Sequence, residues 1–263
     1  MKLIALCNFK NEEWILPIWL KRTSEFADEI IALDDGSTDN TYNLLISHPK
    51  VVKVIRNNPG RPFNVLKNRQ KLLAEAKNRN ADWVIHLDAD EIMDIRLRDV
   101  KDELMSNNNV HRYFFKEITL WKNTEEYRTD RPEMYNRIHK GFAIMARVTP
   151  NIKWVFPYNR FLQYQYAFIK KNKRLSKKVS LWSTLKVENS NFVELHDIKK
   201  IHYHFVDWNK VIKTHMFYAV RKSIEEKTTL DEAFNIVKWA TSRMNEDGLK
   251  LAPVKKEWGT LKL

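Results

Sequence analysis

The first ninety residues alternate between short apolar runs and amphipathic stretches. The apolar runs are residues 2–8, 28–33, 51–55 and 82–87. The stretches with apolar residues at helical spacing are 12–26, 39–47 and 64–78. Runs of this length bounded by polar residues are typical of buried strands, and strands interleaved with helices predict βαβ units in a parallel sheet.

The pattern changes from about Val110. Residues 111–119 and 143–148 read as strands separated by a polar stretch, and the aromatic-rich residues 154–166 read as irregular. Helical spacing returns over 208–226 and 230–244, the latter opened by the capping-box pattern of Thr229 to Glu232. We expect an antiparallel or mixed extension of the sheet, followed by terminal helices.

Two acidic clusters stand at the ends of predicted strands. One is Asp34–Thr41 and the other is Asp88–Glu91. Ligands of open α/β sheets bind at the carboxyl ends of the strands, so both clusters can converge on one pocket. Carboxylates gathered there repel one another unless a cation lies between them, and oxygen ligands suit Mg²⁺ or Mn²⁺. The clusters predict a metal and a phosphorylated ligand.

The composition is that of a globular protein with a substantial core. The chain has 263 residues, of which 43% are hydrophobic and 30% charged. The single cysteine, Cys7, cannot form an intramolecular disulfide, so we predict a small core residue and a reducing compartment. The apolar run at the N-terminus is too short for a signal peptide or a membrane span. We therefore expect a soluble cytoplasmic protein, or one attached peripherally to the inner face of a membrane.

The net charge of +13 favours anionic partners. The densest basic run is Lys170–Lys178. It has two interpretations of equal weight, a solvated loop or a surface that faces an anionic membrane or the acceptor.

Four segments together resemble family-2 glycosyltransferases of the GT-A fold. They are Asn11-Glu12-Glu13, Asp34–Thr41, Asn58-Pro59-Gly60 and His86–Glu91, the last with the DxD element. The resemblance covers about the first hundred residues and thins beyond residue 110. There it suggests the branch of the family that modifies bacterial or viral surface glycans, in which a segment like Ile201–Phe205 often precedes the terminal helices.

The resemblance implies an α/β, GT-A (Rossmann-like) fold with a mixed, mostly parallel sheet flanked by helices. It implies a glycosyltransferase domain over 1–205, with a nucleotide-sugar-binding half (1–110) and an acceptor-side half (111–205). Residues 206–263 would form a C-terminal helical extension.

The resemblance also assigns roles to the acidic residues. Asp90 would ligate the metal, and Asp88 would contact the ribose or reach the metal through water. Asp34 or Asp35 would accept a hydrogen bond from the imide N–H of uracil or thymine. A turn and helix cap explain the Asp34 cluster equally well, and both interpretations can hold together.

Further nucleotide contacts are expected from the loop after the first strand and from the third helix. Asn11 and Glu12 would lie beside the base or ribose, although carboxylates are common at helix starts for dipole reasons. Relatives carry an Arg-Asn pair at the start of the third helix. Here the pair is Lys67-Asn68 followed by Arg69, so either Lys67 or Arg69 could supply the charge, with different geometry.

Two histidines are candidate ligands on the late extended segment. His202 and His204 are two residues apart and therefore point the same way from a strand. One of them, with His204 favoured, would complete the metal coordination, and ordinary polar positions are the alternative. His86 lies inside a predicted strand and reads as a core residue.

The catalytic base should lie on a loop after the fourth strand. Inverting transfer needs a carboxylate that takes a proton from the acceptor hydroxyl. Asp130 and Glu133 fit that placement, and a solvated polar loop is the alternative for each.

These observations predict a metal-dependent inverting glycosyltransferase. The donor would be a UDP- or dTDP-sugar, the cofactor Mn²⁺ or Mg²⁺, and the acceptor a hydroxyl of a glycan or lipid-linked molecule. A sugar-1-phosphate nucleotidyltransferase would need a glycine-rich loop, which residues 8–12 lack. A basic nucleic-acid-binding protein or metal-dependent nuclease fits the charge, but we recognise no nucleic-acid motif and expect no such partner.

Overall fold

A computed structural model of the protein describes residues 1–59, 64–130, 145–155, 184–186, 191–226 and 229–263. Its strands are β1 (Leu3–Phe9), β2 (Glu29–Asp34), β3 (Val51–Arg56), β4 (Trp83–His86), β5 (Glu91–Met93), β6 (Arg112–Trp121), β7 (Glu126–Arg128), β8 (Met145–Arg147), β9 (Lys153–Val155), β10 (Thr184–Lys186), β11 (Phe192–Phe205) and β12 (Leu251–Pro253). Its helices are α1 (Leu16–Ser24), α2 (Thr41–Ser47), α3 (Val65–Asn78), α4 (Leu97–Ser106), α7 (Trp208–Glu226) and α8 (Leu230–Arg243), with a 3₁₀ turn at Lys256–Trp258.

The main sheet is mixed, and its N-terminal half is parallel. The strand order is β12-β7-β6-β8-β4-β1-β2-β3, and the neighbours among β4, β1, β2 and β3 are parallel. Strand β8 runs antiparallel between β4 and β6, while the long β11 is parallel to β6 and antiparallel to β5. The predicted α/β class, with a mixed extension, is confirmed.

The buried strand β1 divides the core into two layers. Leu3, Ala5 and Cys7 belong to the cluster that includes α1, and Ile4 and Leu6 belong to the cluster that includes α3. This division follows from the alternation of side chains along a strand. Cys7 is fully buried, as predicted for a small core residue.

Helix α1 begins later than its apolar spacing predicts. We expected a helix from residue 12, but it starts at Leu16, with proline in its first turn. The residues before it are held by the loop after β2, since the Glu12 N–H donates to Thr41 Oγ1 at 2.8 Å. Helix α4 and strand β5 were not expected.

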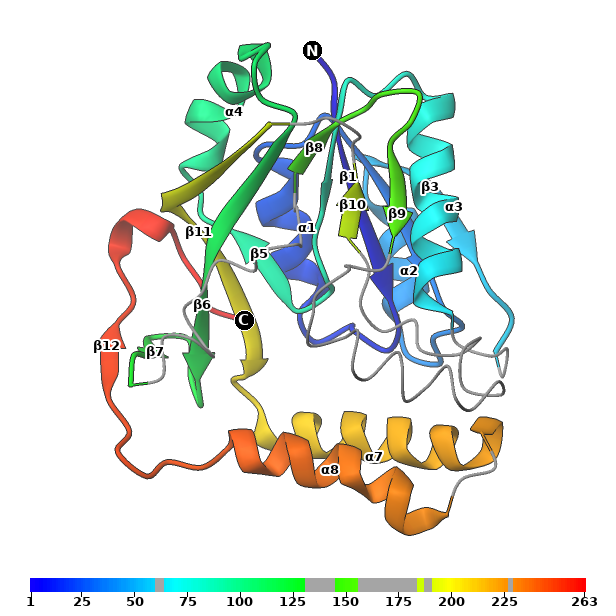
Figure 1. Ribbon diagram of the computed structural model, residues 1–263, viewed down its shortest axis with the longest axis vertical. Coiled ribbons are helices and arrows are strands. Elements are labelled where there is room, and N and C mark those ends of the chain that lie inside the picture. The colour runs from blue at the N-terminus through cyan, green and yellow to red at the C-terminus, as the bar shows by residue number, and fades with distance from the viewer. Residues whose placement is uncertain (60–63, 131–144, 156–183, 187–190, 227–228) are drawn as a thin grey trace.

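The C-terminal residues return to the sheet after two helices. Helices α7 and α8 lie side by side across the end of the sheet toward which β1 points (Figure 1). The chain then pairs β12 with β7, and Trp258 and Leu261 are buried in the same cluster as β1. Arg22 Nη2 donates to the Trp258 carbonyl at 2.6 Å. The region after residue 206 is thus helical only as far as Arg243 and later contributes to the core. None of the described helices is long and apolar enough to span a membrane.

We expect Trp258→Ala to lower the free energy of unfolding by about 3–5 kcal/mol, because the indole is 1% exposed and leaves a large cavity. Chemical denaturation measures the change. Ile46→Ala is the control, since Ile46 is 54% exposed and its loss should cost about 0.5 kcal/mol or less. Equal effects of the two substitutions would contradict the packing of the C-terminal segment.

Candidate functional site

The candidate site lies where the loops after β1, β2 and β4 meet the end of β11. The first two loops are joined by side chain to backbone hydrogen bonds. The Asn11 N–H donates to Ser37 Oγ at 3.0 Å, and the Thr38 N–H donates to Asn11 Oδ1 at 2.8 Å. Asn11 has a φ of 55°, a left-handed conformation that asparagine tolerates. Asn11 therefore fixes the shape of this rim.

Asp34 and Asp35 are both buried but have different partners. Asp34 Oδ1 accepts from the Ser37 N–H at 3.0 Å, and Asp34 Oδ2 lies 3.3 Å from Arg56 Nε. Asp35 Oδ1 accepts from Asn57 Nδ2 at 2.6 Å, whereas Asp35 Oδ2 is buried without a hydrogen-bond partner among the described residues. Buried carboxylate oxygens are seldom left unpaired, so Asp35 retains the capacity to accept one more donor.

Gly36 keeps the loops after β2 and β3 in contact. Its φ is 74°, and a Cβ there would lie 2.9 Å from Pro59 Cα. Only glycine fits such an approach in this conformation.

Arg69 is the basic residue that the fold brings to the DxD turn. Its Nη2 donates to Asp88 Oδ1 at 2.7 Å, and its guanidinium carbon lies 5.0 Å from the centre of the Trp154 ring. Lys67 is exposed in the first turn of α3, where its N–H donates to Asn64 Oδ1. The geometry favours Arg69 over Lys67 as the charge beside Asp88.

Asp90 and the two histidines of β11 form a compact group. Asp90 Oδ2 lies 3.3 Å from His202 Nε2 and 3.2 Å from His204 Nδ1. The Tyr203 N–H donates to the Asp90 carbonyl at 2.8 Å, which fixes β11 against the turn. One ligand atom from each of the three side chains lies within 4.8 Å of the others, so the group fits a metal ion. Asp88 is outside this group.

A buried charged network lies behind the histidines. Lys200 Nζ forms ion pairs with Glu91 Oε1 and, at 2.7 Å, with Glu117 Oε2. Glu117 Oε1 is 3.3 Å from His202 Nδ1, and Glu91 Oε2 accepts from the Asp88 N–H at 3.0 Å. The network links the DxD turn to β6, which carries Glu117, and to β11, which carries Lys200 and both histidines. We did not foresee Glu117 or Lys200, although a glutamate inside the apolar segment 111–119 was a visible signal.

The electrostatics of this cluster follow from burial and opposed charges. Burial lowers the pKa of His202, but Asp90 and Glu117 more than offset that effect and raise it to about 10. Burial lowers the pKa of His204 below its ordinary value, although Asp90 opposes the shift. Burial raises the pKa of Asp90, yet the His202 charge and hydrogen bond bring it well below its usual range. At neutral pH His202 is therefore protonated and places a positive charge beside Asp90.

Helix α7 reaches the site through Lys210. Its ammonium lies 2.6 Å from Glu12 Oε2, which also accepts from Trp14 Nε1 at 2.6 Å. Burial raises the pKa of Glu12 to about 7, with Lys210 opposing the shift and Asp90 adding to it. Glu12 is thus engaged by α7 and lies within the field of Asp90.

The expected catalytic carboxylates are not brought to this group by the described residues. Asp130 accepts two hydrogen bonds from Arg128, at 2.8 and 2.9 Å, and those bonds lower the pKa of Asp130. A carboxylate held in this way is a weaker base, and the role of Asp130 as catalytic base stays a prediction. Glu133, like the run Lys170–Lys178, lies outside the described residues.

Two further features bear on the expectations. His86 is buried edge-on against Trp154 at 4.8 Å between ring centres, and burial lowers its pKa to about 3, as suits a core histidine.

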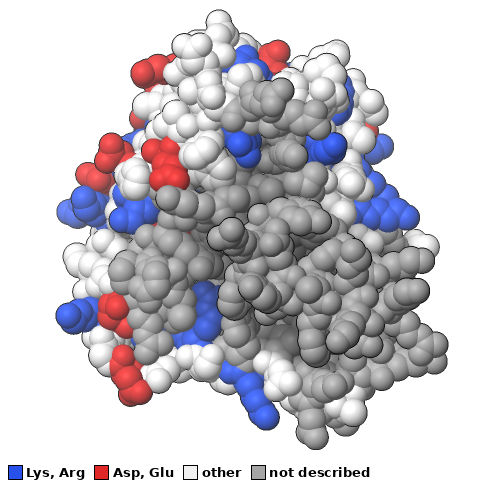
Figure 2. All heavy atoms as spheres, in the orientation of Figure 1, with Lys and Arg blue, Asp and Glu red and all other residues white. Residues whose placement is uncertain are grey.

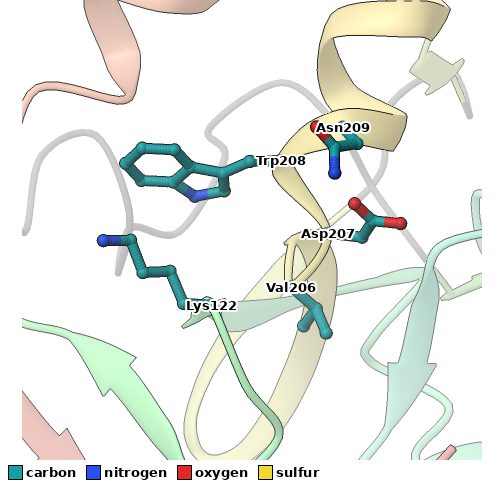
Figure 3. Close-up of a pocket in the computed structure, with 5 residues that line it drawn as sticks. All are labelled: Lys122, Val206, Asp207, Trp208 and Asn209. Carbon is teal, nitrogen blue, oxygen red and sulfur yellow. The ribbon is translucent and has the colours of Figure 1, made fainter.

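A shallow pocket of about 310 Å³ opens between Lys122 and the start of α7 (Figure 3). It is lined by Lys122, Val206, Asp207, Trp208 and Asn209, and it begins two residues after His204.

The basic charge is not concentrated in one patch of the face seen in Figure 2. There the described Lys and Arg side chains are spread around the rim, with Asp and Glu among them on one side. This distribution gives no support to an extended nucleic-acid surface on the described part of that face.

Comparisons with known proteins agree with this geometry. The model of glycosyl transferase family 2 matches residues 7–168. An uncharacterized glycosyltransferase of Rickettsia typhi is 27% identical over 157 residues, which make up 56% of this chain and 50% of that protein. An uncharacterized protein of Mycobacterium tuberculosis is 34% identical over 107 residues, 38% of this chain and 26% of that protein. The chain thus spans half or less of the length of these relatives.

A solved structure of S. aureus TarS, residues 1–349, is similar over 95% of this chain and 75% of that chain, with 14% identity and a TM-score of 0.47. A similarity this low is no evidence about the substrate of this chain. The family match covers more than half of the sequence and includes the ends of β1, β2 and β4, their loops and the DxD turn, whereas β11 lies beyond it. The chain belongs to glycosyl transferase family 2 and has the GT-A type of fold predicted for it.

Proposed function

We propose that the protein is a metal-dependent inverting glycosyltransferase that moves a sugar from a UDP- or dTDP-linked donor to a hydroxyl of a glycan or lipid-linked acceptor. The observation that carries the proposal is the convergence of Asp90, His202 and His204 at the carboxyl edge of the sheet. Family membership supplies the reaction class, and this group supplies the place where the donor diphosphate would be held.

The residues that would hold the metal are Asp90 and His204, with Asp88 reaching it through water. A carboxylate and an imidazole suit Mn²⁺, and a carboxylate with water suits Mg²⁺. When bound, the ion supplies positive charge that stabilises the departing nucleoside diphosphate. The protein's own contribution is to hold Asp90 through the Tyr203 N–H and to surround it with imidazoles.

The donor nucleotide would bind along the loops after β1, β2 and β3. Asp35 offers a buried oxygen without a hydrogen-bond partner among the described residues, which suits the imide N–H of uracil or thymine. Arg69 lies beside Asp88, and Asn11 and Glu12 form the opposite rim. A pyrimidine nucleoside diphosphate would offer partners to these groups: the imide N–H to Asp35, and phosphate or ribose oxygens and hydroxyls to Arg69, Asn11 and Glu12.

The acceptor side includes the end of β11 and the start of α7. The pocket beside Trp208 offers an indole, a carboxylate and an amide close to His204 along the chain, groups that suit sugar hydroxyls. Peripheral contact with an anionic membrane would bring a lipid-linked acceptor to this edge.

We expect calorimetry to show UDP and dTDP binding that requires Mn²⁺. GDP should bind more weakly, because the one unpartnered Asp35 oxygen suits the single imide N–H of uracil or thymine, whereas guanine offers an N–H and an amino group side by side. Asp90→Asn should abolish the metal-dependent part of UDP binding and reduce sugar transfer by at least roughly a hundredfold, since several kcal/mol of charge stabilisation are lost. Because the Asp90 side chain is only 25% exposed and pairs with His202, its loss should also lower the midpoint of thermal unfolding, so binding is measured at a temperature where the variant is folded.

Asp82→Asn is the matched control for that variant. Asp82 lies before β4, at the opposite end of the strand from Asp90, where it accepts from the Lys2 N–H. It should transfer sugar at the wild-type rate. No UDP binding by the wild type in the presence of Mn²⁺ would contradict the proposed function.

We expect Arg69→Lys to weaken UDP binding roughly tenfold, because lysine cannot both bond Asp88 and stack on Trp154. Lys67→Met should change UDP affinity far less, since the Lys67 side chain is exposed. Calorimetry of both variants decides between the two residues. A larger loss in Lys67→Met would assign the charge to Lys67 instead.

A further inference from the structure

The buried network behind the histidines contains more charge than core packing requires. Glu91, Glu117 and Lys200 are each between 4% and 7% exposed, and they lie on three different strands or their ends. Burying ionised groups costs several kcal/mol each unless they are paired. Apolar residues would fill the same volume without that cost, so the retained charges call for a role.

One carboxylate is enough to neutralise Lys200, yet two are present. Lys200 Nζ pairs with Glu91 and with Glu117. Glu91 has a second contact, the Asp88 N–H, which shapes the DxD turn. The second contact of Glu117 is the ring of His202, through Oε1 and Nδ1 at 3.3 Å. Each carboxylate therefore joins Lys200 to a different part of the Asp90 site.

The contact of Glu117 decides which nitrogen of His202 faces the site. Nδ1 donates its proton to Glu117, and Nε2 lies 3.3 Å from Asp90 Oδ2, so a metal bound beside Asp90 would displace the Nε2 proton while the Nδ1 proton stays with Glu117. A carboxylate behind a histidine fixes the ring and its tautomer and increases its basicity as a metal ligand. His202 thus has Glu117 on its Nδ1 side and Asp90 on its Nε2 side.

A second group of ligand atoms does not compete for the ion. Glu91, Glu117 and His202 also lie within 4.8 Å of one another. The Lys200 ammonium already pairs with both carboxylates of that group, so a divalent cation there would meet a fixed positive charge. Of the two groups that the described residues form, the one at Asp90, His202 and His204 is therefore the better place for the metal.

We propose that Glu117, held by Lys200, is a positioning residue that presents His202 Nε2 to the metal, so that the site has two imidazoles and one carboxylate. This inference rests on the proposed function, because it concerns the same metal. Two nitrogen ligands favour a transition ion over Mg²⁺, which takes oxygen ligands. The site therefore binds Mn²⁺ more tightly than Mg²⁺.

The test compares Mn²⁺ affinity, measured from the free Mn²⁺ signal in electron paramagnetic resonance, in Glu117→Leu and Glu117→Gln in the presence of UDP. Glu117→Leu removes the contact with His202 and should weaken Mn²⁺ binding about ten- to a hundredfold. Glu117→Gln keeps an oxygen that accepts from Nδ1 and should recover part of that loss. If Glu117 only neutralises Lys200, both variants lose the same charge and bind Mn²⁺ alike, which overturns the proposal.

His202→Gln supplies a second route if Glu117→Leu does not fold, because His202 has a partly exposed side chain. It should weaken Mn²⁺ binding more than Mg²⁺ binding, and adding Glu117→Gln to it should cause no further loss, since Glu117 acts through His202. Wild-type affinity in His202→Gln, or additive losses in the double variant, would overturn the proposal.

Glu29→Gln is the matched control. Glu29 is also a carboxylate with two cationic neighbours, Lys2 and Arg79, but it lies at the opposite end of β2 from the site. It should leave Mn²⁺ affinity unchanged. Wild-type protein that binds neither Mn²⁺ nor UDP would reject the proposed function itself, whereas normal binding with silent Glu117 and His202 variants would reject this inference alone.

Discussion

The ion pairs of Lys200 with Glu91 and Glu117 are the interaction on which the arrangement of the site depends. They join the DxD turn, β6 and β11, which are far apart in the sequence. Without them the buried carboxylates would repel one another, and the backbone contacts between β11 and the DxD turn would have to hold Asp90 opposite the two imidazoles against that repulsion. A buried ion pair contributes little net stability, but it strongly penalises any arrangement that separates its members.

The loops of the site are shaped by a second set of contacts. In them, backbone N–H groups are bonded by side chains rather than by other strands: Ser37 by Asp34, Glu12 by Thr41, and Asp88 by Glu91. Short polar side chains compete well for backbone groups where a strand has just ended. The acidic segments therefore serve two purposes, since they build the rim and supply its charge.

Much of the fold and part of the site could be predicted from the sequence. Strands β1 to β4 follow from short apolar runs, and the bounds of α7 match the helical spacing over 208–226. The pairing of His202 with His204 on one face follows from the two-residue period of a strand. The nearness of His204 to Asp90 was expected only from the family resemblance, because the residue pattern alone does not join positions more than a hundred apart. The contact of Arg128 with both oxygens of Asp130 could not be predicted, because the sequence does not show it.

The return of the C-terminal segment has a consequence for how the chain acquires its structure. Trp258 and Leu261 complete the layer that covers β1, and Tyr203 Oη donates to the Leu261 carbonyl at 2.8 Å. Because the first strand and the last residues share one cluster, that layer cannot close during synthesis before residue 261 has left the ribosome. Contacts between such distant segments also carry a high loop-closure cost and slow folding. Until then the part of this layer beside Arg22 and Tyr127, which Trp258 contacts, would be exposed to chaperones or to aggregation.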